Sequence, residues 1–266
     1  MSETRQMLVD ERRAAIMSIL DRESSVQVTS LSELLGTSKV TIRSDLDALE
    51  KAGRLRRTHG GAVSLSRRVT SSLQDRRVNI NAEAKHRIGM LAATLVPDGA
   101  SIFVDSGTTA LELVKSLDER SGITIVTTDL TIADYVDSSL PHADVILLGG
   151  FVRKAHRYTA GPIALRVLEG LRPDISFVCP TGYALGIGLM TNYLEMGEMK
   201  QLAMHRSPLT CVLFDASKIG APCLVKFGEI SEADVVVMDH DPDGVIAAEL
   251  GDEADKLLLA DAAGVL

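Results

Sequence analysis

Residues 26–63 constrain the fold more than any other part of the chain. They show two short helical patterns on either side of a tight turn, followed by a basic hairpin pattern. Leu31, Leu34 and Leu35 follow the i, i+3, i+4 spacing of one buried helical stripe. Gly36 then stands where a helix end commonly needs a left-handed residue. The pattern predicts a short helix that ends at a turn near Gly36.

A second helix is expected directly after this turn. Ser38 suits its N-cap, and Gly53 closes it. We expect Val40, Leu46 and Leu49 to turn toward the interior, which leaves polar side chains exposed near the N-terminal end. Two helices joined in this way form a helix-turn-helix.

A basic stretch follows the second helix and leads to Gly60–Gly61, a sequence typical of a hairpin turn. A basic hairpin after such a helix is the layout of a winged helix. In a helix-turn-helix that reads DNA, the N-terminal part of the second helix meets base edges in the major groove. The candidate DNA-binding residues are Ser38, Lys39, Thr41, Arg43, Ser44, Arg56, Arg57 and His59.

The distribution of charge bears on this interpretation, because helix-turn-helix pairs also occur in proteins that do not bind DNA. Residues 1–70 hold 12 Lys and Arg against 9 Asp and Glu, whereas residues 71–266 hold 16 against 27. An acidic chain that is basic in one stretch confines its attraction for phosphate to that module. The asymmetry favours double-stranded DNA as a partner.

The string TSKVTIRSDLDALEKAGRLRRTHGGAV resembles the N-terminal signature of the DeoR family of bacterial sugar-metabolism regulators. That signature includes an upstream Arg-x-x-x-Ile segment, which Arg12 to Ile16 matches. The other matching residues are Ser38, Thr41, Ile42, Arg43, Asp45, Leu46, Leu55, Arg57, His59, Gly60 and Gly61. Many members carry a second basic residue after the first Arg, where this chain has Ser44. The resemblance therefore does not carry over the operator sequence or the affinity.

Length and composition suit two domains in 266 residues, of which 45% are hydrophobic. We expect a winged helix-turn-helix over 1–64, a linker over 65–80 and an α/β effector-sensing domain over 81–266. No apolar stretch approaches the roughly 20 residues that span a bilayer, so we expect a cytoplasmic protein. The three cysteines form no Cys-x-x-Cys pair, and we expect neither a metal nor a cofactor.

From residue 101 onward, strand and helix patterns alternate, which predicts a mostly parallel α/β sheet. Strands are expected at 101–105, 123–128, 144–150, 175–180, 209–214, 235–238 and 256–260. Helices are expected at about 82–95, 108–118, 130–138, 162–171 and 192–206. Ligands of such sheets bind beyond the carboxyl ends of the strands.

The residues at these strand ends indicate an anionic ligand. A glycine and three hydroxyls over 106–109 stand where a helix begins, and they could form a phosphate cradle or simply cap that helix. Small or polar residues also end the other strands, and Lys218 adds a cation. This combination suits a ligand that is both polyhydroxylated and anionic.

These strand ends also resemble the C-terminal sensor domain of the DeoR family. The matching pieces are DSGTT at 105–109, LLGG at 147–150, GP at 161–162, GLMT at 188–191, the helix 195–204 with Lys200, and DASKIG at 215–220. The resemblance implies a fold of the ribose-5-phosphate-isomerase type and a phosphorylated sugar as effector. It assigns the phosphate to Ser106–Thr109 and the sugar to Asp105, Asp129, Glu195 and Lys218.

The full set of effector-binding candidates is Asp105, Ser106, Gly107, Thr108, Thr109, Asp129, Gly149, Gly150, Thr181, Gly182, Glu195 and Lys218. Family members often have an acidic loop near Thr181 and Asn in place of Asp129, so the effector itself stays open. Glu195 and Glu198 could equally form a solvated helix face. The basic residues Arg153, Lys154, His156 and Arg157 could form a mobile lid or an exposed loop.

The sequence predicts a transcriptional regulator, more readily a repressor than an activator, that binds operator DNA as a symmetric dimer or tetramer. Its effector would shift the oligomer between two arrangements of the DNA-reading heads. The alternative is a sugar-phosphate isomerase with an accessory DNA-binding head, with Asp105, Asp129 or Glu195 as the base. Isomerases of this fold place an acidic loop where this chain has Thr181, so we expect no enzymatic activity.

Overall fold

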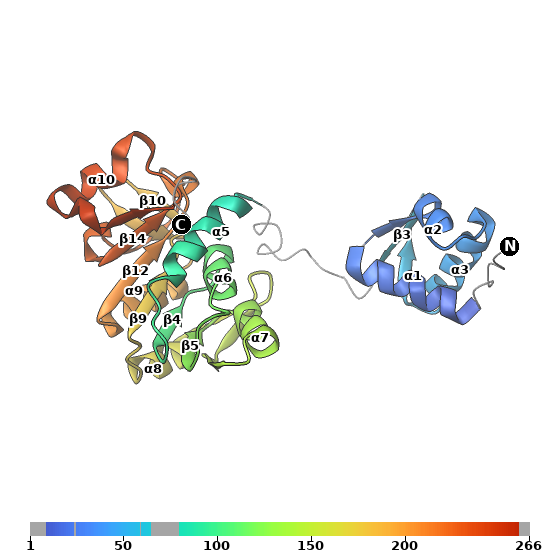
Figure 1. The fold of residues 1–266 in the computed structure, drawn as a ribbon, viewed down its shortest axis with the longest axis horizontal. Helices are drawn as coiled ribbons and strands as arrows, with labels where there is room; N and C mark the ends of the chain where they lie inside the picture. Colours follow the sequence, from blue (N-terminus) through green and yellow to red (C-terminus); the bar gives the residue numbers. More distant parts are fainter. Residues whose placement is uncertain (1–8, 24, 59, 65–79, 261–266) are drawn as a thin grey trace. The chain divides into compact units, whose positions relative to one another are not determined.

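The computed structural model describes residues 9–23, 25–58, 60–64 and 80–260. The chain divides into two compact units, Met1–Ser71 and Ser72–Leu266 (Figure 1). They are called the DNA-reading unit and the sensor unit here, after the roles that the sequence predicts for them. The expected linker over 65–80 lies outside the described residues except for Ile80. Within the described ranges, no helix is both long enough and apolar enough to cross a membrane.

The DNA-reading unit packs three helices against a small antiparallel sheet. The helices are α1 (Val9–Glu23), α2 (Val28–Leu34) and α3 (Lys39–Lys51). The strands are β1 (Ser25–Gln27), β2 (Leu55–Arg57) and β3 (Gly61–Ser64), in the order β1-β3-β2. Ile16 and Leu20 from α1, Ile42 and Leu46 from α3, and Leu55 from β2 are fully buried together. The unit is therefore a winged helix, as predicted.

The predicted turn between α2 and α3 is confirmed, but two predictions of burial are wrong. Gly36 has φ +59°, and the Ser38 Oγ accepts a hydrogen bond from Thr41 N at 3.1 Å. Leu34 and Val40 were expected inside, yet they are 66% and 73% exposed. Ile42, Leu46 and Leu49 form the buried stripe of α3 instead, and Val40, two residues before Ile42, lies on the opposite side of the helix. The start of α3 thus exposes an apolar side chain.

The sensor unit is built on a seven-stranded parallel sheet, and all seven predicted strands are confirmed. The strands are β4 (Ser101–Val104), β5 (Ile123–Thr127), β6 (Ala143–Leu147), β9 (Ile175–Val178), β12 (Leu209–Leu213), β14 (Val235–Met238) and β15 (Leu257–Leu259). Their order is β15-β14-β12-β9-β4-β5-β6. The chain thus runs outward in one direction from β4 and in the other from β9.

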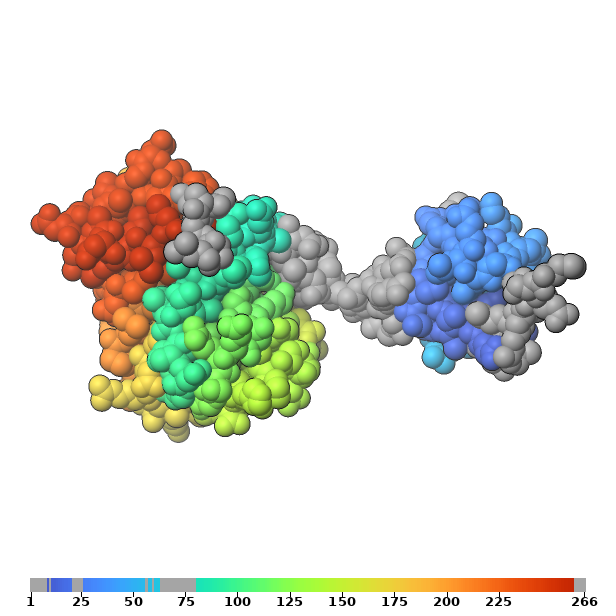
Figure 2. All heavy atoms as spheres, in the orientation of Figure 1, coloured from blue at the N-terminus to red at the C-terminus, as the bar shows by residue number. Residues whose placement is uncertain are grey.

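Helices cover both faces of this sheet (Figure 1). They are α5 (Ala82–Ala93), α6 (Thr108–Lys115), α7 (Leu130–Ser139), α8 (Pro162–Glu169), α9 (Leu194–Arg206) and α10 (Val245–Leu250). Short 3-10 helices are η1 (Ala216–Lys218), η2 (Ile230–Glu232), η3 (Pro242–Gly244) and η4 (Gly251–Lys256). The segment from α5 to α7, in green shades, forms much of the face that Figure 2 turns to the reader.

Two apolar clusters fill the spaces between the sheet and its helices. Ile102 and Val104 of β4 pack into the cluster that contains residues of α5, α6 and α7. Phe103, between them in sequence, packs into the cluster that contains residues of α8, α9 and α10. Successive side chains of a strand point to opposite faces, so one strand serves both cores.

Several short antiparallel strands, which the sequence analysis did not predict, surround the carboxyl edge of the sheet. A hairpin joins β7 (Phe151–Arg153) to β8 (Tyr158–Ala160). A second small sheet orders β10 (Gly182–Ala184), β11 (Gly188–Thr191) and β13 (Val225–Gly228). The basic residues at 153–157, interpreted as a lid or a loop, lie at the end of β7 and in the turn of the β7–β8 hairpin.

Candidate functional site

A cavity of about 300 Å³ opens at the carboxyl edge of the parallel sheet. The loops that follow β4 and β9 both line it, through Ser106–Thr109 and Cys179–Thr181. These two strands are neighbours, and the chain leaves them in opposite directions along the sheet. Loops diverge at such a switch point and leave a crevice, which is where open α/β sheets bind ligands.

The loop after β4 brings backbone and hydroxyl groups to one wall of the cavity. Helix α6 starts at Thr108 with Gly107 as its N-cap, so neither Ser106 nor Thr109 caps it. Gly107 has φ +140°, and a Cβ at this position would meet nothing within 4 Å, so the loop faces open space. A helix start with a partial positive charge and nearby hydroxyls suits an anion.

The charges that line the cavity are predominantly positive. Lys85, Lys200 and Lys218 line it, whereas none of the lining residues in the described part of the chain is Asp or Glu. The Lys200 ammonium is paired with Asp105 behind the wall, and Lys218 Nζ lies 3.9 Å from Asp215 Oδ2. Lysines in the cavity lining, with no carboxylate among the described lining residues, favour an anionic ligand.

Asp105 lies behind the cavity wall and holds its parts together. Its Oδ1 accepts a hydrogen bond from Ser106 N at 2.8 Å, and its Oδ2 accepts one from Cys179 N at 2.8 Å and another from Lys200 Nζ. The carboxylate is fully buried. Asp105 therefore joins the ends of β4 and β9 to helix α9, and it does not line the cavity.

Asp129 supports the same loop from the other side. Its Oδ1 accepts hydrogen bonds from Thr131 N and Ile132 N, at 2.7 and 3.2 Å, and so caps α7. Its Oδ2 accepts a hydrogen bond from Gly107 N at 3.1 Å. Because the side chain is fully buried and bonded in this way, Asp129 fixes the position of the loop that lines the cavity.

A buried ion pair fixes α3, which is expected to read DNA and is here called the recognition helix. Arg12 Nε lies 2.6 Å from Asp45 Oδ2, and Arg13 Nε lies 3.1 Å from Asp45 Oδ1. Arg57 of the wing donates to Asp47 and to the backbone carbonyl of Arg43. These contacts hold α1 and the wing against α3.

Most of the polar candidates at the start of α3 are open to solvent. Lys39, Arg43 and Ser44 are exposed, and Thr41 is half-buried with its hydroxyl 2.9 Å from that of Ser38. His59 and the side chain of Arg56 lie outside the described part of the chain. The exposed set presents a polar and cationic surface on one side of α3.

Comparisons with known proteins agree with both units. The model of the DeoR C-terminal sensor domain matches residues 80–240, and the model of the DeoR-like helix-turn-helix domain matches residues 12–68. The chain belongs to the DeoR family. It is thus a member of a family of helix-turn-helix transcriptional regulators.

Two relatives span most of the chain, and one solved structure is similar to about half of it. The HTH-type transcriptional regulator GolR of Listeria innocua is 31% identical over 86% of this chain and 90% of its own length. The HTH-type transcriptional repressor GlcR of Bacillus subtilis is 27% identical over 96% of this chain and 98% of its own. A ribose-5-phosphate isomerase A of Methanocaldococcus jannaschii is similar over 52% of this chain and 55% of its own, with 16% identity and a TM-score of 0.39.

The DeoR matches coincide with the features described above. The helix-turn-helix match begins at Arg12, the residue paired with buried Asp45. The sensor-domain match contains every cavity-lining residue, from Ile80 to Pro222. Both DeoR regions of this chain therefore include the residues that organise their sites.

The cavity unites some of the effector candidates and leaves others outside. Those that line it are Ser106, Gly107, Thr108, Thr109, Thr181 and Lys218. Gly149, Gly150 and Gly182 do not; a Cβ on Gly150 would lie 2.4 Å from the Ala160 carbonyl oxygen, so that glycine permits β8 to pack closely. Glu195 is exposed outside the cavity, with its Oε2 3.9 Å from Arg153 Nη1.

Several residues that line the cavity are absent from the predicted set of effector-binding residues. His156 and Tyr158 come from the β7–β8 hairpin, and Tyr193 precedes α9. The Tyr193 hydroxyl lies 3.1 Å from His156 Nε2, and the Arg153 guanidinium carbon lies 3.6 Å from the centre of the Tyr193 ring. Three-residue strands carry too little periodicity to be recognised, so the sequence does not place Tyr158 at the cavity. It indicates His156 only as one of a basic cluster that could form a lid or a loop, and Tyr193 only as part of the helix expected at 192–206.

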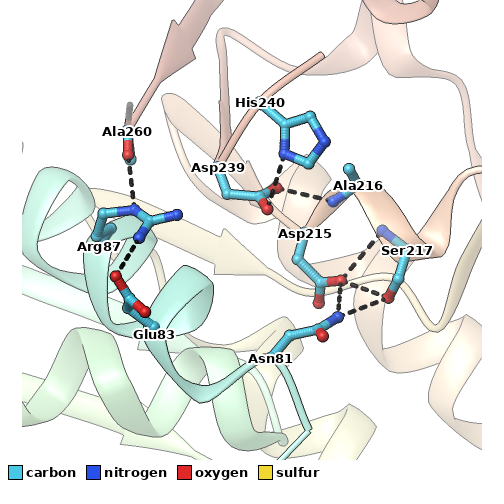
Figure 3. Close-up of polar contacts among 9 residues, drawn as sticks. All are labelled: Asn81, Glu83, Arg87, Asp215, Ala216, Ser217, Asp239, His240 and Ala260. Carbon is cyan, nitrogen blue, oxygen red and sulfur yellow. Dashed lines mark hydrogen bonds and ion pairs between the residues drawn. The ribbon is translucent and has the colours of Figure 1, made fainter. Parts of the chain in front are cut away.

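Asn81 ties the start of α5 to the loop after β12 (Figure 3). Its Nδ2 donates to Asp215 Oδ1 at 2.9 Å and to Ser217 Oγ at 3.1 Å. Burial alone would raise the pKa of Asp215, but hydrogen bonds from Ser217 and Asn81 and the nearby Lys218 lower it. Ile80 and Lys218 both line the cavity. Ile80, which lines the cavity, therefore directly precedes Asn81, whose side chain bonds to Asp215 and Ser217.

Replacing Asp129 with Ala should destabilise the sensor unit by about 1–2 kcal/mol, because α7 loses its N-cap and the Gly107 N–H loses an acceptor. Urea unfolding of the full chain, followed by circular dichroism, would measure the change. Asp129→Asn retains a carbonyl oxygen for the cap and should be milder. Equal stability of Asp129→Ala and the unchanged protein would contradict this supporting role.

Proposed function

We propose that this DeoR-family protein is a repressor of carbohydrate-metabolism genes whose binding to duplex operator DNA is modulated by a phosphorylated sugar. The observation that carries the proposal is the cavity at the switch point of the sheet, which is lined by lysines and hydroxyls and, among its described lining residues, by no carboxylate. A phosphate group needs cations and N–H donors, and a sugar needs hydroxyl partners. The name of GlcR as a repressor supports the sign of regulation.

In the DNA-reading unit, we assign direct contacts with the operator to the exposed start of α3. Lys39, Arg43 and Ser44 supply hydrogen-bond donors for phosphates and base edges. Val40, which is 73% exposed beside them, suits contact with a thymine methyl group. The bonds of Arg57 to Asp47 and the Arg43 carbonyl support a positioning role, in which it holds the wing against the recognition helix.

In the sensor unit, we assign the phosphate to Ser106–Thr109 and the sugar to the opposite part of the cavity, near Thr181 and Lys218. Asp105 and Asp129 would act through the loops that they hold, because their carboxylates are buried and bonded to backbone N–H groups. With this assignment, no described residue that lines the cavity is a carboxylate base, which supports ligand binding without turnover.

We propose a symmetric dimer or tetramer as the DNA-binding form, in the bacterial cytoplasm. A single short recognition helix buries too little surface for tight specific binding, and two-fold symmetry supplies a second helix. By linkage, the effector weakens operator binding only as far as it prefers the arrangement that does not bind DNA.

Thermal stabilisation against a panel of sugars, each with and without its phosphate, tests the sensor half. A ligand that binds only the folded protein at about 100 times its Kd stabilises it by about 2.7 kcal/mol, which a melting curve resolves. We expect a shift with a phosphorylated sugar and none with its parent sugar. No shift with any phosphorylated sugar would argue against the proposed effector class.

Replacing Thr108 with Val should reduce this shift and blunt the response of operator binding to the effector, because the cradle loses one hydroxyl. Operator binding without effector should stay unchanged. Thr124→Val, in β5 and away from the cavity lining, is the matched control and should respond normally. A full response in Thr108→Val would place the phosphate elsewhere.

A further inference from the structure

Tyr158 combines deep burial with a hydroxyl that has no partner. Its side chain is 5% exposed, and no described residue forms a hydrogen bond with its hydroxyl. Three other buried polar atoms in the described chain share this property: Thr128 Oγ1, Tyr183 OH and Asp215 Oδ2. Of these four residues, Tyr158 alone lines the cavity. A buried hydroxyl without a partner is unfavourable, so its presence at a ligand cavity calls for an explanation.

Backbone hydrogen bonds fix the chain on both sides of Tyr158, next to the Ser106–Thr109 loop to which we assign the phosphate. Leu130 N donates to the Arg157 carbonyl at 2.8 Å, and Thr159 N donates to the Thr128 carbonyl at 2.9 Å. Tyr158 itself forms a β-bridge with Asp129, whose carboxylate accepts the Gly107 N–H. Tyr158 is therefore paired with Asp129, the residue that holds the Ser106–Thr109 loop in place.

The environment also determines what the hydroxyl can do. Burial, partly offset by Arg153, raises the pKa of Tyr158 to about 12. The phenol therefore stays protonated at neutral pH and can donate a hydrogen bond. Among the residues that line the cavity, it adds a neutral donor to the lysine ammonium groups.

We propose that the Tyr158 hydroxyl donates a hydrogen bond to an acceptor oxygen of the ligand held over Ser106–Thr109, and that it is a specificity-determining residue of the cavity. This inference rests on the proposed function, in which that ligand is a phosphorylated sugar. A site built to bond a ligand oxygen discriminates strongly against a ligand that lacks it, because the buried hydroxyl would remain unpaired.

Tyr158→Phe tests the proposal because it removes one oxygen atom and little else. Two results are expected together. The ligand-free variant should melt at the same temperature as the unchanged protein or higher, since an unpaired buried hydroxyl is gone. Its Kd for the bound probe should rise about 10-fold, since the hydrogen bond to the ligand is lost.

The probes for calorimetric titration are inorganic phosphate, ribose 5-phosphate, fructose 1-phosphate and glucose 6-phosphate. A loss of affinity for inorganic phosphate as well as for a sugar phosphate would place the acceptor on the phosphate group, and a loss for the sugar phosphate alone would place it on the sugar. Either result supports the proposal. Tyr183→Phe is the matched control, because Tyr183 is also buried but does not line the cavity, and its Kd should not change.

Three outcomes would overturn the proposal and are distinguishable from one another. If the unchanged protein binds a probe and Tyr158→Phe binds it equally well, the inference fails and the proposed function stands. If the unchanged protein binds none of the four probes, the proposed effector class fails and the inference fails with it. A lower melting temperature of ligand-free Tyr158→Phe would also overturn it, because the hydroxyl would then have a structural partner.

Discussion

Replacing Lys200 with Met should destabilise the sensor unit by about 3–5 kcal/mol, because it leaves the Asp105 carboxylate buried without its cation. Asp105 is fully buried and Lys200 is 3% exposed, so water cannot readily replace the lost ammonium group. The carboxylate also holds the ends of β4 and β9 together through its hydrogen bonds to Ser106 N and Cys179 N. The midpoint of urea unfolding, followed by circular dichroism, would measure the loss.

Two further variants separate the loss of the ion pair from the loss of a lysine. Lys154→Met removes an exposed lysine in the turn of the β7–β8 hairpin, and its stability should change by less than about 0.5 kcal/mol. Adding Asp105→Asn to Lys200→Met removes the unpaired charge and should recover part of the stability. A single Lys200→Met variant as stable as Lys154→Met would show that the pair contributes little.

Replacing Arg43 with Ala should weaken operator binding by about 1–3 kcal/mol, roughly 5-fold to 150-fold, because a guanidinium at the start of the recognition helix is lost. Arg43 is exposed, and its backbone carbonyl, which accepts the Arg57 hydrogen bond, remains in the variant. The fold of the DNA-reading unit should therefore survive. Fluorescence anisotropy with a duplex that the unchanged protein selects from a random library would measure the affinity.

Lys51→Ala provides the matched control for Arg43→Ala. Lys51 is exposed at the other end of the same helix. The Lys51→Ala substitution also removes one positive charge, but far from the start of α3, so it should weaken operator binding less than Arg43→Ala does. Effector binding by the sensor unit should be unchanged in both variants. An Arg43→Ala protein that binds the selected duplex as tightly as Lys51→Ala would rule out this arginine as a base-reading residue.

The elements that could be predicted from the sequence are those whose burial follows a simple period. The five inner strands of the parallel sheet (β14, β12, β9, β4 and β5) are apolar runs whose residues are mostly buried, and α3 has a clear buried stripe. Val40 was misplaced because a short helix offers several apolar positions, and only packing against α1 selects Ile42. The hairpin that carries Tyr158 was not predicted, because its strands have three residues each.

The candidate site was predictable only in part, for a physical reason that Asp105 and Asp129 illustrate. A polar side chain at a strand end can face a ligand or bond backbone N–H groups of a neighbouring loop. The sequence places both residues at the correct edge of the sheet, but the choice depends on loops far away in the chain, such as Cys179 for Asp105. Lys85 and Lys200 reach the cavity from helices α5 and α9. The helical pattern alone does not distinguish a lysine that faces a cavity from one on a solvated surface.

The position of Ile80 in the cavity wall has a consequence for building hybrid regulators. A designer who joins this sensor to a foreign DNA-binding head must choose where one parent ends and the other begins. A junction after Asn81 would replace part of the cavity and remove the bonds to Asp215 and Ser217. A junction before Ile80 keeps both residues with the sensor, so the hybrid would retain the ligand preference of this parent while its operator is changed.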